Sequence, residues 1–322
     1  MNSNRRRLTA CVAVALAAPR AVLAQQAMRT VGVLTPHRED PSYSAFPEML
    51  RKLGYVEGRN LRLLVRSADW KQERLPALAR ELLDARAEVI VAVNTPGTRA
   101  AMQATTSIPI VFAIVGDPLG SGFVSNLARP GGNVTGISNM TGEIASKRMS
   151  ILRELVPGVK RIAVLYNPVD PVTKPQIRDA QRDAPALGVE VRFFPVKTVP
   201  ELPEAFAQML AWKANAAFWL SGQANAFQPG SSELALKHRF PVMVTLRNDV
   251  EAGGLISYYP DHIELYRRTA VYVDRILKGG KPGELPVELP ARFELVINLR
   301  TARAIGLAVP QAMRLRADRV IE

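Results

Sequence analysis

The residues of this chain that are best placed to do chemistry are suited to holding a small polar molecule. Asn94-Thr95-Pro96-Gly97-Thr98 follows an apolar run and opens a predicted helix. The hydroxyls of Thr95 and Thr98, with the free backbone N–H groups at the helix start, suit a carboxylate. Asp117 follows the next predicted strand, where its carboxylate would hold an ammonium group. The structural alternatives are a helix cap at Thr95 and an Asx turn at Asp117.

Further candidates follow other predicted strands. Asn167 and Asn225 lie in the second half of the chain, and each offers an amide group to a cleft. Tyr43 and Tyr258 are candidates to cover one face of a ligand, although tyrosines more often have a structural role. Residues 247–249 (Arg, Asn and Asp) follow another strand and are further cleft candidates. Each of these side chains is of a type that forms hydrogen bonds with a polar solute. The pattern therefore predicts a binding protein.

Patterns typical of catalysis or metal binding are missing from the sequence. It has no GxSxG motif, no Walker A loop and no GxGxxG after a strand, and the glycines of residues 116–122 have the wrong spacing. The three histidines, His37, His238 and His262, lie far apart and not in a metal-ligand spacing. The sequence therefore predicts a protein that is not an enzyme and needs no cofactor and no metal.

The N-terminus has the pattern of an export signal. Residues 5–7 are three arginines, and residues 8–18 form an apolar run. Val22 and Ala24 occupy the small-residue positions that a signal peptidase reads. The run is shorter than the about 20 residues that span a bilayer. We therefore predict that residues 1–24 are removed, that the mature chain begins at Gln25, and that it lies in a bacterial periplasm.

This segment has two alternative interpretations. Residues 8–11 match a lipoprotein signature, but Cys11 precedes the apolar run, so a lipid anchor is not expected. Residues 5–8 resemble a twin-arginine signal only weakly, because three arginines suit either export route. Cys11 is the only cysteine of the chain. Its removal with the signal would leave no thiol and no disulfide in the mature protein.

Composition limits the classes of partner. The chain has 42 Lys and Arg against 29 Asp and Glu, and removing the four arginines of residues 1–24 lowers the formal net charge from +13 to +9. These charges are scattered rather than gathered in a basic tract, so nucleic-acid binding is not expected. The positive net charge is still compatible with an anionic solute as the ligand. A mature chain of about 300 residues predicts two domains.

Short apolar runs alternate with amphipathic segments along the whole chain, which is typical of βα units around parallel sheets. Strands are predicted at 30–34, 61–65, 89–93, 108–114, 134–137, 161–166, 189–194, 216–220, 242–244, 255–258 and 293–297. Helices are predicted at 46–53, 75–82, from 97, 121–127, 143–155, 174–187, 202–212, 232–240, 261–277 and 299–305. The rhythm restarts after Thr141, so two doubly wound α/β lobes are expected. Ligands of such sheets bind beyond the carboxyl ends of the strands, which predicts a site between the lobes.

Several strings of the sequence are characteristic in combination. They are LAQQ (23–26), GYVEGRN (54–60), LPALA (75–79), IPIVF (108–112), GDP (116–118), RPGGNVTG (129–136), LRELVP (152–157), FELVINL (293–299) and RADRVI (316–321). Together they closely resemble the ABC-transporter substrate-binding protein family, whose members include tryptophan- and phenylalanine-binding lipoproteins. The resemblance covers essentially the whole mature chain.

This resemblance implies a type I periplasmic-binding fold with two lobes joined by three hinge crossovers. The crossovers would fall near Ile137, near Leu255 and after Pro282. Lobe 1 would comprise residues 28–137 and 256–282, and lobe 2 would comprise residues 138–255 and 283–322. The Thr95–Thr98 loop, Asp117, Asn167 and Asn225 fall where relatives line the cleft. Residues 221–227 differ from the aromatic-amino-acid binders, so the identity of the ligand does not carry over.

The expected function is therefore that of an exported, monomeric solute-binding protein of an ABC importer. It would capture a small polar solute, an amino acid or a carboxylate, and deliver it to an ABC permease in the inner membrane. One alternative is a sensor subunit that presents its ligand to a membrane receptor. Another is an exported enzyme on the same scaffold, since fold does not dictate function.

Overall fold

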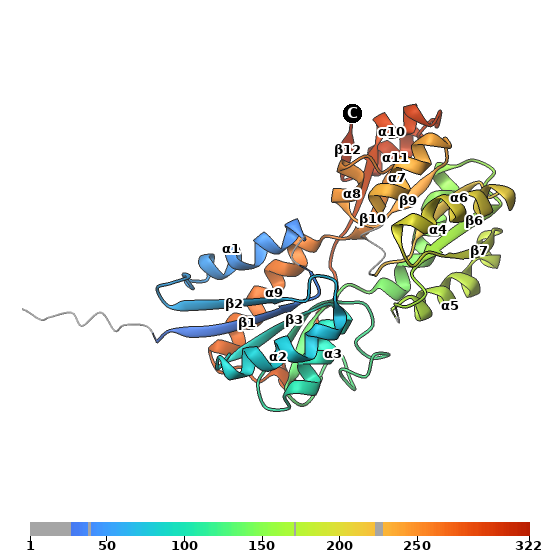
Figure 1. Ribbon diagram of the computed structural model, residues 1–322. Helices are drawn as coiled ribbons and strands as arrows, with labels where there is room; N and C mark the ends of the chain where they lie inside the picture. Colours follow the sequence, from blue (N-terminus) through green and yellow to red (C-terminus); the bar gives the residue numbers. More distant parts are fainter. Residues whose placement is uncertain (1–26, 38–39, 171, 223–227) are drawn as a thin grey trace, which may run out of the picture.

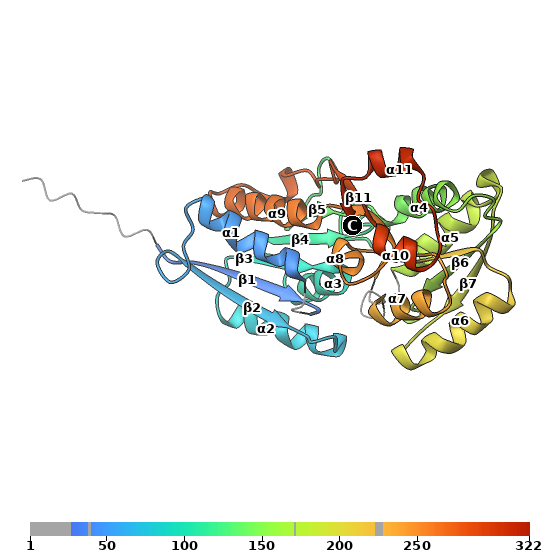
Figure 2. The ribbon, with the colours of Figure 1, turned by 90° about the horizontal axis from the view of Figure 1, so that it is seen from above.

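Two α/β lobes lie side by side in the computed structural model, and each has one sheet with helices on both faces (Figures 1 and 2). The structure describes residues 27–37, 40–170, 172–222 and 228–322. The predicted export signal and Asn225 lie outside these ranges. Within them, no helix combines the length and the apolar character that crossing a membrane requires.

The first lobe contains a five-stranded, wholly parallel sheet in the order β2-β1-β3-β4-β5. Its N-terminal elements are β1 (Arg29–Thr35), η1 (Pro41–Ser44), α1 (Ala45–Lys52), β2 (Leu61–Ser67), η2 (Gln72–Arg74), α2 (Leu75–Asp84), β3 (Val89–Val93), α3 (Asn94–Ala104), β4 (Ile110–Val115) and β5 (Val134–Ser138). Two later elements complete the lobe, namely α9 (His262–Leu277) and η6 (Pro282–Glu284).

The second lobe contains a seven-stranded sheet in the order β12-β11-β10-β9-β8-β6-β7. Its elements are α4 (Thr141–Leu155), β6 (Arg161–Tyr166), α5 (Thr173–Asp183), η3 (Pro185–Leu187), β7 (Glu190–Pro195), η4 (Val199–Glu201), α6 (Leu202–Ala211), β8 (Ala216–Trp219), α7 (Gln228–Lys237), β9 (Val242–Val244), α8 (Arg247–Glu251), β10 (Ile256–Pro260), β11 (Phe293–Asn298), α10 (Leu299–Ala304), α11 (Gln311–Arg316) and β12 (Arg319–Ile321). All pairs are parallel except β10 with β11. The predicted fold class, two doubly wound α/β lobes, is confirmed.

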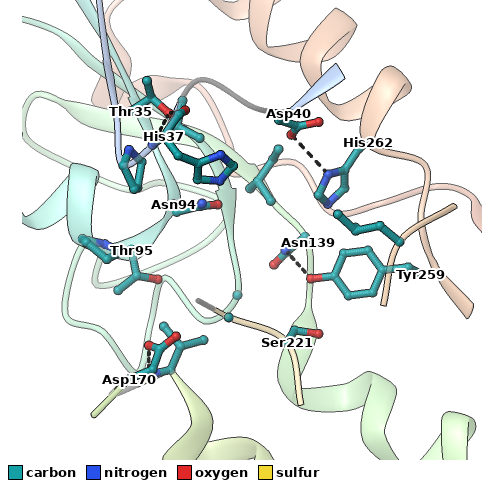
Figure 3. Close-up of a pocket in the computed structure, with 18 of the residues that line it drawn as sticks. Thr35, His37, Asp40, Asn94, Thr95, Asn139, Asp170, Ser221, Tyr259 and His262 are labelled. Atoms are coloured by element: carbon teal, nitrogen blue, oxygen red, sulfur yellow. Dashed lines mark hydrogen bonds and ion pairs between the residues drawn. The ribbon is translucent and has the colours of Figure 1, made fainter. Parts of the chain in front are cut away.

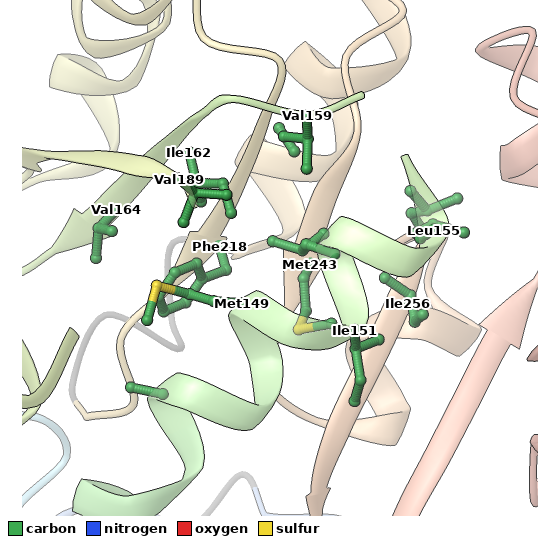
Figure 4. Packing of buried hydrophobic residues seen from close by; sticks show 14 of the residues in the cluster. Met149, Ile151, Leu155, Val159, Ile162, Val164, Val189, Phe218, Met243 and Ile256 are labelled. Atoms are coloured by element: carbon green, nitrogen blue, oxygen red, sulfur yellow. The ribbon is translucent and has the colours of Figure 1, made fainter. Parts of the chain in front are cut away.

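Burial explains why these segments form strands and helices. All five residues of β3 and all six of β4 are buried, because helices cover both faces of a parallel sheet. The predicted stripe of α2 is buried as expected, with Leu75, Leu78 and Leu82 facing the sheet. In the second lobe, Met149 of α4 packs near Ile162 and Phe218 of the sheet (Figure 4). Each lobe therefore has its own core.

Strands β4 and β5 approach unusually closely at Gly136. Gly136 pairs with Phe112, and a Cβ built on Gly136 would lie 2.1 Å from the backbone oxygen of Phe112. No side chain larger than hydrogen fits there without moving the strands apart. Because β5 leads directly into the first crossover, this contact also fixes where the chain leaves the first lobe.

The chain crosses between the lobes three times, but two crossovers differ from those expected. The first follows β5, close to the expected Ile137. The second follows Pro260 rather than Leu255, because β10 pairs with β9 and β11 and so belongs to the second lobe. The third follows Glu288, which still bridges to Ile137 of the first lobe. An apolar run in a sequence predicts a strand without indicating which of two sheets the strand will join.

A few short elements also differ from expectation. Residues 121–127 form turns and bends rather than a helix. Helices α8 and α11 and strand β12 were not predicted, since runs of three to six residues carry little periodic signal. Strand β11 runs antiparallel to β10 because the chain re-enters the second lobe directly from the first, without a covering helix between the two strands in that lobe.

Candidate functional site

A cavity of about 370 Å³ lies between the two lobes (Figure 3). The first lobe lines it with the ends of β1, β3 and β4 and with the start of α3. The second lobe contributes the loop before α5, the segment after β8 and the start of α8. Asn139, Tyr259 and His262 come from the first two crossovers. A volume of this size is within the range of small-molecule sites.

The start of α3 gives the cavity a helix N-terminus, which is an end that favours anions. Thr95 lines the cavity and is 7% exposed, and no described side chain caps the helix N-terminus. Pro96 has no N–H, so Thr95 and its neighbours supply the donors of the first turn. Asn94 has φ +61°, a left-handed conformation that asparagine tolerates better than most residues. This residue turns the chain sharply from β3 into α3.

A second strained residue lies at the end of the adjacent strand. Ile114 has φ +61°, which is a genuine outlier for a β-branched residue, and the register of β4 on β5 shifts between Ala113 and Val115. Such strain costs on the order of 1–3 kcal/mol and gathers at ligand sites. Asn94 and Ile114 both line the cavity. Two strained residues of the first lobe thus lie where its strands meet the cavity.

Asp170 gives the cavity an acidic group from the second lobe. It is 2% exposed, and its Oδ1 accepts a hydrogen bond of 3.1 Å from the amide of Val172. Gly222 lies so close that a Cβ on it would be 2.3 Å from Asp170 Oδ2. Figure 3 places Asp170 on the same side of the cavity as Thr95. A carboxylate from one lobe and a helix N-terminus from the other therefore line the same cavity.

A polar cluster occupies the side of the cavity beside the crossovers. His262 Nδ1 lies 3.6 Å from Asp40 Oδ2, and Asn139 Nδ2 donates a hydrogen bond of 3.0 Å to the Tyr259 hydroxyl (Figure 3). Asp249 Oδ2 accepts the amide of Leu246 at 3.0 Å. We call Asp40, Asn139, Asp249, Tyr259 and His262 the crossover cluster. It joins groups from both lobes to the segments about which the lobes would move.

The two carboxyls of the crossover cluster have opposite pKa shifts. Burial opposes ionisation of Asp40, but the nearby His262, with its charge, and the amide of Ser42 lower the pKa of Asp40 to about 2. Burial raises the pKa of Asp249 to about 6, against the hydrogen bond from Leu246 and the charge of His262. The cavity thus holds one strongly ionised carboxylate and one that is close to neutralisation.

Asp249→Asn should stabilise the ligand-free protein at neutral pH. The folded state favours protonated Asp249, so its contribution is present below the ordinary pKa of 3.8 and is lost as pH rises to about 6. Asparagine stays neutral and still accepts the Leu246 amide. We expect the variant to gain up to about 3 kcal/mol over wild type at pH 7 and little at pH 4. Urea unfolding at both pH values measures this difference, and an equal effect at both would contradict it.

The ring pair of His37 and Trp70 forms a flat part of the cavity wall. The two rings stack with centroids 4.0 Å apart and planes 5° apart, and both residues line the cavity. The described lining contains the carboxylates Asp40, Asp170 and Asp249 but no lysine or arginine. A solute that enters therefore meets an excess of negative charge.

A buried arginine lies among the strands of the second lobe near the cluster. Arg148 is 2% exposed and donates to the backbone oxygens of Trp219 at 2.5 Å and Val244 at 2.9 Å. Burial lowers the pKa of Arg148 to about 10. Its guanidinium donates to backbone oxygens at the ends of β8 and β9. Arg148 therefore supports these strand ends and does not line the cavity.

The structure brings part of the predicted site to the cavity. Thr95 lines it, as do Asn248 and Asp249 of the predicted 247–249 run. Thr98 does not, because its hydroxyl donates to the backbone oxygen of Asn94 at 2.8 Å. Asp117 lies outside the lining and accepts the Gly120 amide at 2.7 Å, as in the Asx-turn alternative.

Three further predicted residues also lie outside the lining. Asn167 accepts the Val169 amide at 3.1 Å within its own loop. Tyr43 packs between aromatic rings of the first lobe. Tyr258 stacks on Phe293 with ring centroids 5.5 Å apart. These side chains stabilise loops and cores near the cavity in this arrangement of the lobes.

The sequence reasoning missed Asp40, Asn139, Asp170, Tyr259 and His262. Strand alternation places Tyr258 and Tyr259 on opposite faces of β10, so the choice of tyrosine was off by one residue. Asn139 directly follows a strand and was detectable by the rule that selected Asp117. Among the described residues, no group of three or more His, Cys, Asp or Glu is placed to hold a metal ion.

Comparison with known proteins gives consistent matches over nearly the whole chain. The model of a family described as ABC transporter substrate binding protein matches residues 32–321. A curated protein of Clostridioides difficile (strain R20291), named tyrosine-binding protein, is 25% identical over 281 residues, which is 87% of this chain and 79% of that protein.

Two solved structures are similar in both fold and sequence. A conserved domain protein from Vibrio cholerae is 28% identical with a TM-score of 0.84, covering 91% of this chain and 99% of that one. An ABC domain from Streptococcus pneumonia, solved in complex with L-Trp, is 25% identical with a TM-score of 0.84, covering 92% of this chain and 100% of that one.

Proposed function

Because the chain belongs to the family of ABC transporter substrate-binding proteins, we propose that it captures an α-amino acid in the cavity between its lobes. The observation that supports this choice is the pairing of Thr95 and the α3 N-terminus with Asp170 across the cleft. An α-amino acid carries a carboxylate and an ammonium group on adjacent atoms. These are the two charges that the helix end and the buried carboxylate attract.

Capture would couple ligand binding to the arrangement of the lobes. The carboxylate is held by Thr95 and the first-turn N–H groups of lobe 1, and the ammonium is held by Asp170 of lobe 2. Only a closed pair of lobes satisfies both charges, so the ligand shifts the population toward closure. The closed protein then delivers the amino acid to an ABC permease in the inner membrane.

The excess of carboxylates in the lining favours an amino acid over a plain carboxylate. A dianion would face Asp40 and Asp170 with no described lysine or arginine in the lining to compensate. The similar curated protein is named for tyrosine binding, and the similar structure from Streptococcus pneumonia holds L-Trp. Both names support the amino-acid class. The N-terminal pattern and the family further support an exported, monomeric protein whose mature chain begins at Gln25.

A ligand screen on the mature chain tests this proposal. The chain from Gln25 is unfolded and refolded to remove any ligand retained from expression, and its melting is then followed with each of the proteinogenic amino acids. A ligand at 100 times its dissociation constant should add about 2.7 kcal/mol to the free energy of unfolding. Simple carboxylates and amines serve as controls. The proposal fails if the refolded protein melts cooperatively and no amino acid stabilises it.

Thr95→Val should weaken amino-acid binding about 10- to 100-fold, since it removes a hydroxyl donor to a charged carboxylate without changing the shape of the side chain. Thr98→Val is the matched control one turn along the same helix, because its hydroxyl is used by backbone oxygens. We expect Thr98→Val to keep the affinity and to lose about 1 kcal/mol of stability. Calorimetric titration and thermal melts distinguish the two, and equal affinities in both variants would remove Thr95 from the site.

A further inference from the structure

The cavity has a second polar end, away from the groups assigned to the amino-acid head. Thr95 and Asp170 lie on one side of Figure 3, and Asp40, Asn139, Tyr259 and His262 of the crossover cluster lie on the other. Asp249 lies within reach of the charge of His262. The lining of the cavity also includes the apolar residues Val93, Ile114 and Leu246. A side chain extending from the amino-acid head would pass these walls and reach the crossover cluster.

The crossover cluster contains buried polar atoms that have no hydrogen-bond partner in the described part of the chain. Asn139 is 3% exposed, its Nδ2 is used by Tyr259, and its Oδ1 is buried with no hydrogen-bond partner among the described residues. Both ring nitrogens of His262 are likewise buried without a hydrogen bond there, and only Nδ1 faces Asp40. A buried polar atom without a partner is unfavourable unless something else supplies the partner.

Asp249 adds a carboxylate to these acceptors. One of its oxygens accepts the Leu246 amide, and the other accepts no hydrogen bond from the described part of the chain. Asn139, Asp249 and His262 come from the first crossover, from α8 and from the start of α9, respectively. Asn139 and Asp249 thus supply acceptor atoms from segments distant in sequence, and His262 lines the same cavity beside them.

We propose that the crossover cluster selects amino acids whose side chain ends in an N–H or O–H donor. This inference rests on the proposed function and adds a specificity to it. A phenol, an indole or an amine would donate to Asn139 Oδ1 or to Asp249, whereas a hydrocarbon side chain would leave these acceptors unpaired. A site built around such acceptors discriminates strongly against an analogue that lacks the donor. An acidic side chain would instead be repelled by Asp40 and Asp249.

Pairs of ligands that differ only in the donor provide the test. Refolded mature protein is titrated calorimetrically with tyrosine against phenylalanine, and with lysine against norleucine. The first pair probes a neutral donor and the second a cationic one. We expect the donor-bearing ligand of at least one pair to bind about 100-fold more tightly than its partner, and glutamate to bind more weakly than either. The pair that shows the difference identifies the type of donor.

The outcomes separate this inference from the proposed function. If phenylalanine binds as tightly as tyrosine and norleucine binds as tightly as lysine, or if only hydrocarbon amino acids bind, the donor selectivity is refuted while amino-acid capture stands. If no amino acid binds to the folded protein, the proposed function fails and this inference fails with it. Every result of the titrations therefore decides at least one of the two.

A variant locates the selectivity in the cluster. Asp249→Asn keeps an acceptor for the Leu246 amide but replaces the other carboxylate oxygen with an N–H₂ group, which cannot accept from the ligand. We expect the affinity ratio within the selective pair to fall at least 10-fold. Asp318→Asn is the matched control, because Asp318 accepts the Leu295 amide at 2.9 Å in the same lobe and lies outside the cavity lining. An unchanged ratio in Asp249→Asn, and also in Asn139→Ser, would overturn the assignment to the cluster.

Discussion

Asp170→Asn is expected to weaken amino-acid binding about 100-fold or more while leaving the fold intact. The substitution removes one negative charge from a residue that is 2% exposed. It keeps an oxygen that can accept the Val172 amide, so the loop before α5 should hold its shape. A buried charge pair that loses one partner loses roughly 2–5 kcal/mol of binding free energy, since the ligand's ammonium is then buried without a counter-charge.

The control for this experiment is Asp179→Asn on the following helix. Asp179 pairs with Arg182 at 3.0 Å and does not line the cavity, so its loss should leave the affinity unchanged. Calorimetric titration gives the affinities, and thermal melts of the ligand-free proteins check the folds. If Asp170→Asn binds amino acids as tightly as wild type, Asp170 is not the ammonium partner.

Gly136→Ala is expected to destabilise the first lobe by about 4 kcal/mol or more. An added Cβ would lie 2.1 Å from the backbone oxygen and 2.6 Å from the backbone nitrogen of Phe112, which are distances that no side-chain rotation relieves. Strands β4 and β5 would have to separate at their Phe112–Gly136 pair. The melting temperature should fall by roughly 10 °C, or the protein should fail to fold.

Gly58→Ala separates this clash from the general effect of replacing a glycine. Gly58 has φ +77°, but a Cβ there would meet no atom within 4 Å. Its replacement should cost only about 1–2 kcal/mol, the strain of a left-handed alanine. A similar loss of stability in both variants, measured by urea unfolding, would show that the β4–β5 contact is softer than its geometry implies.

The regular elements of the fold were predictable because each carries its own periodic signal. The β-branched run at Val89–Val93 and the stripe of α2 indicate a buried strand and an amphipathic helix without reference to the rest of the chain. The assignment of β10 to the second lobe was not predictable in this way. It depends on the register of Ile256 against Met243 and Ile297, which only the tertiary structure sets.

The candidate site was predictable only where a strand end leads into a helix. Thr95 follows that rule, and the structure places it in the cavity lining. Asp117 follows the same rule, yet its carboxylate turns back to the Gly120 amide. Sequence position gives the edge of the sheet on which a side chain lies. It does not show whether that side chain forms its hydrogen bonds within its own loop. Asp40 and His262 are more than 200 residues apart, so no local pattern could join them.

The position of α9 late in the sequence has a consequence for the folding of the first lobe during synthesis. Strands β1 to β5 are complete at Ser138, but one face of their sheet is covered by α9, which begins only at His262. On a ribosome that synthesises the chain from its N-terminus, the valines of that face stay exposed until most of the protein has emerged. The first lobe therefore cannot finish folding before strands β6 to β10 of the second lobe have been synthesised. A chain delayed in this way remains longer in the extended form that a translocation channel can thread.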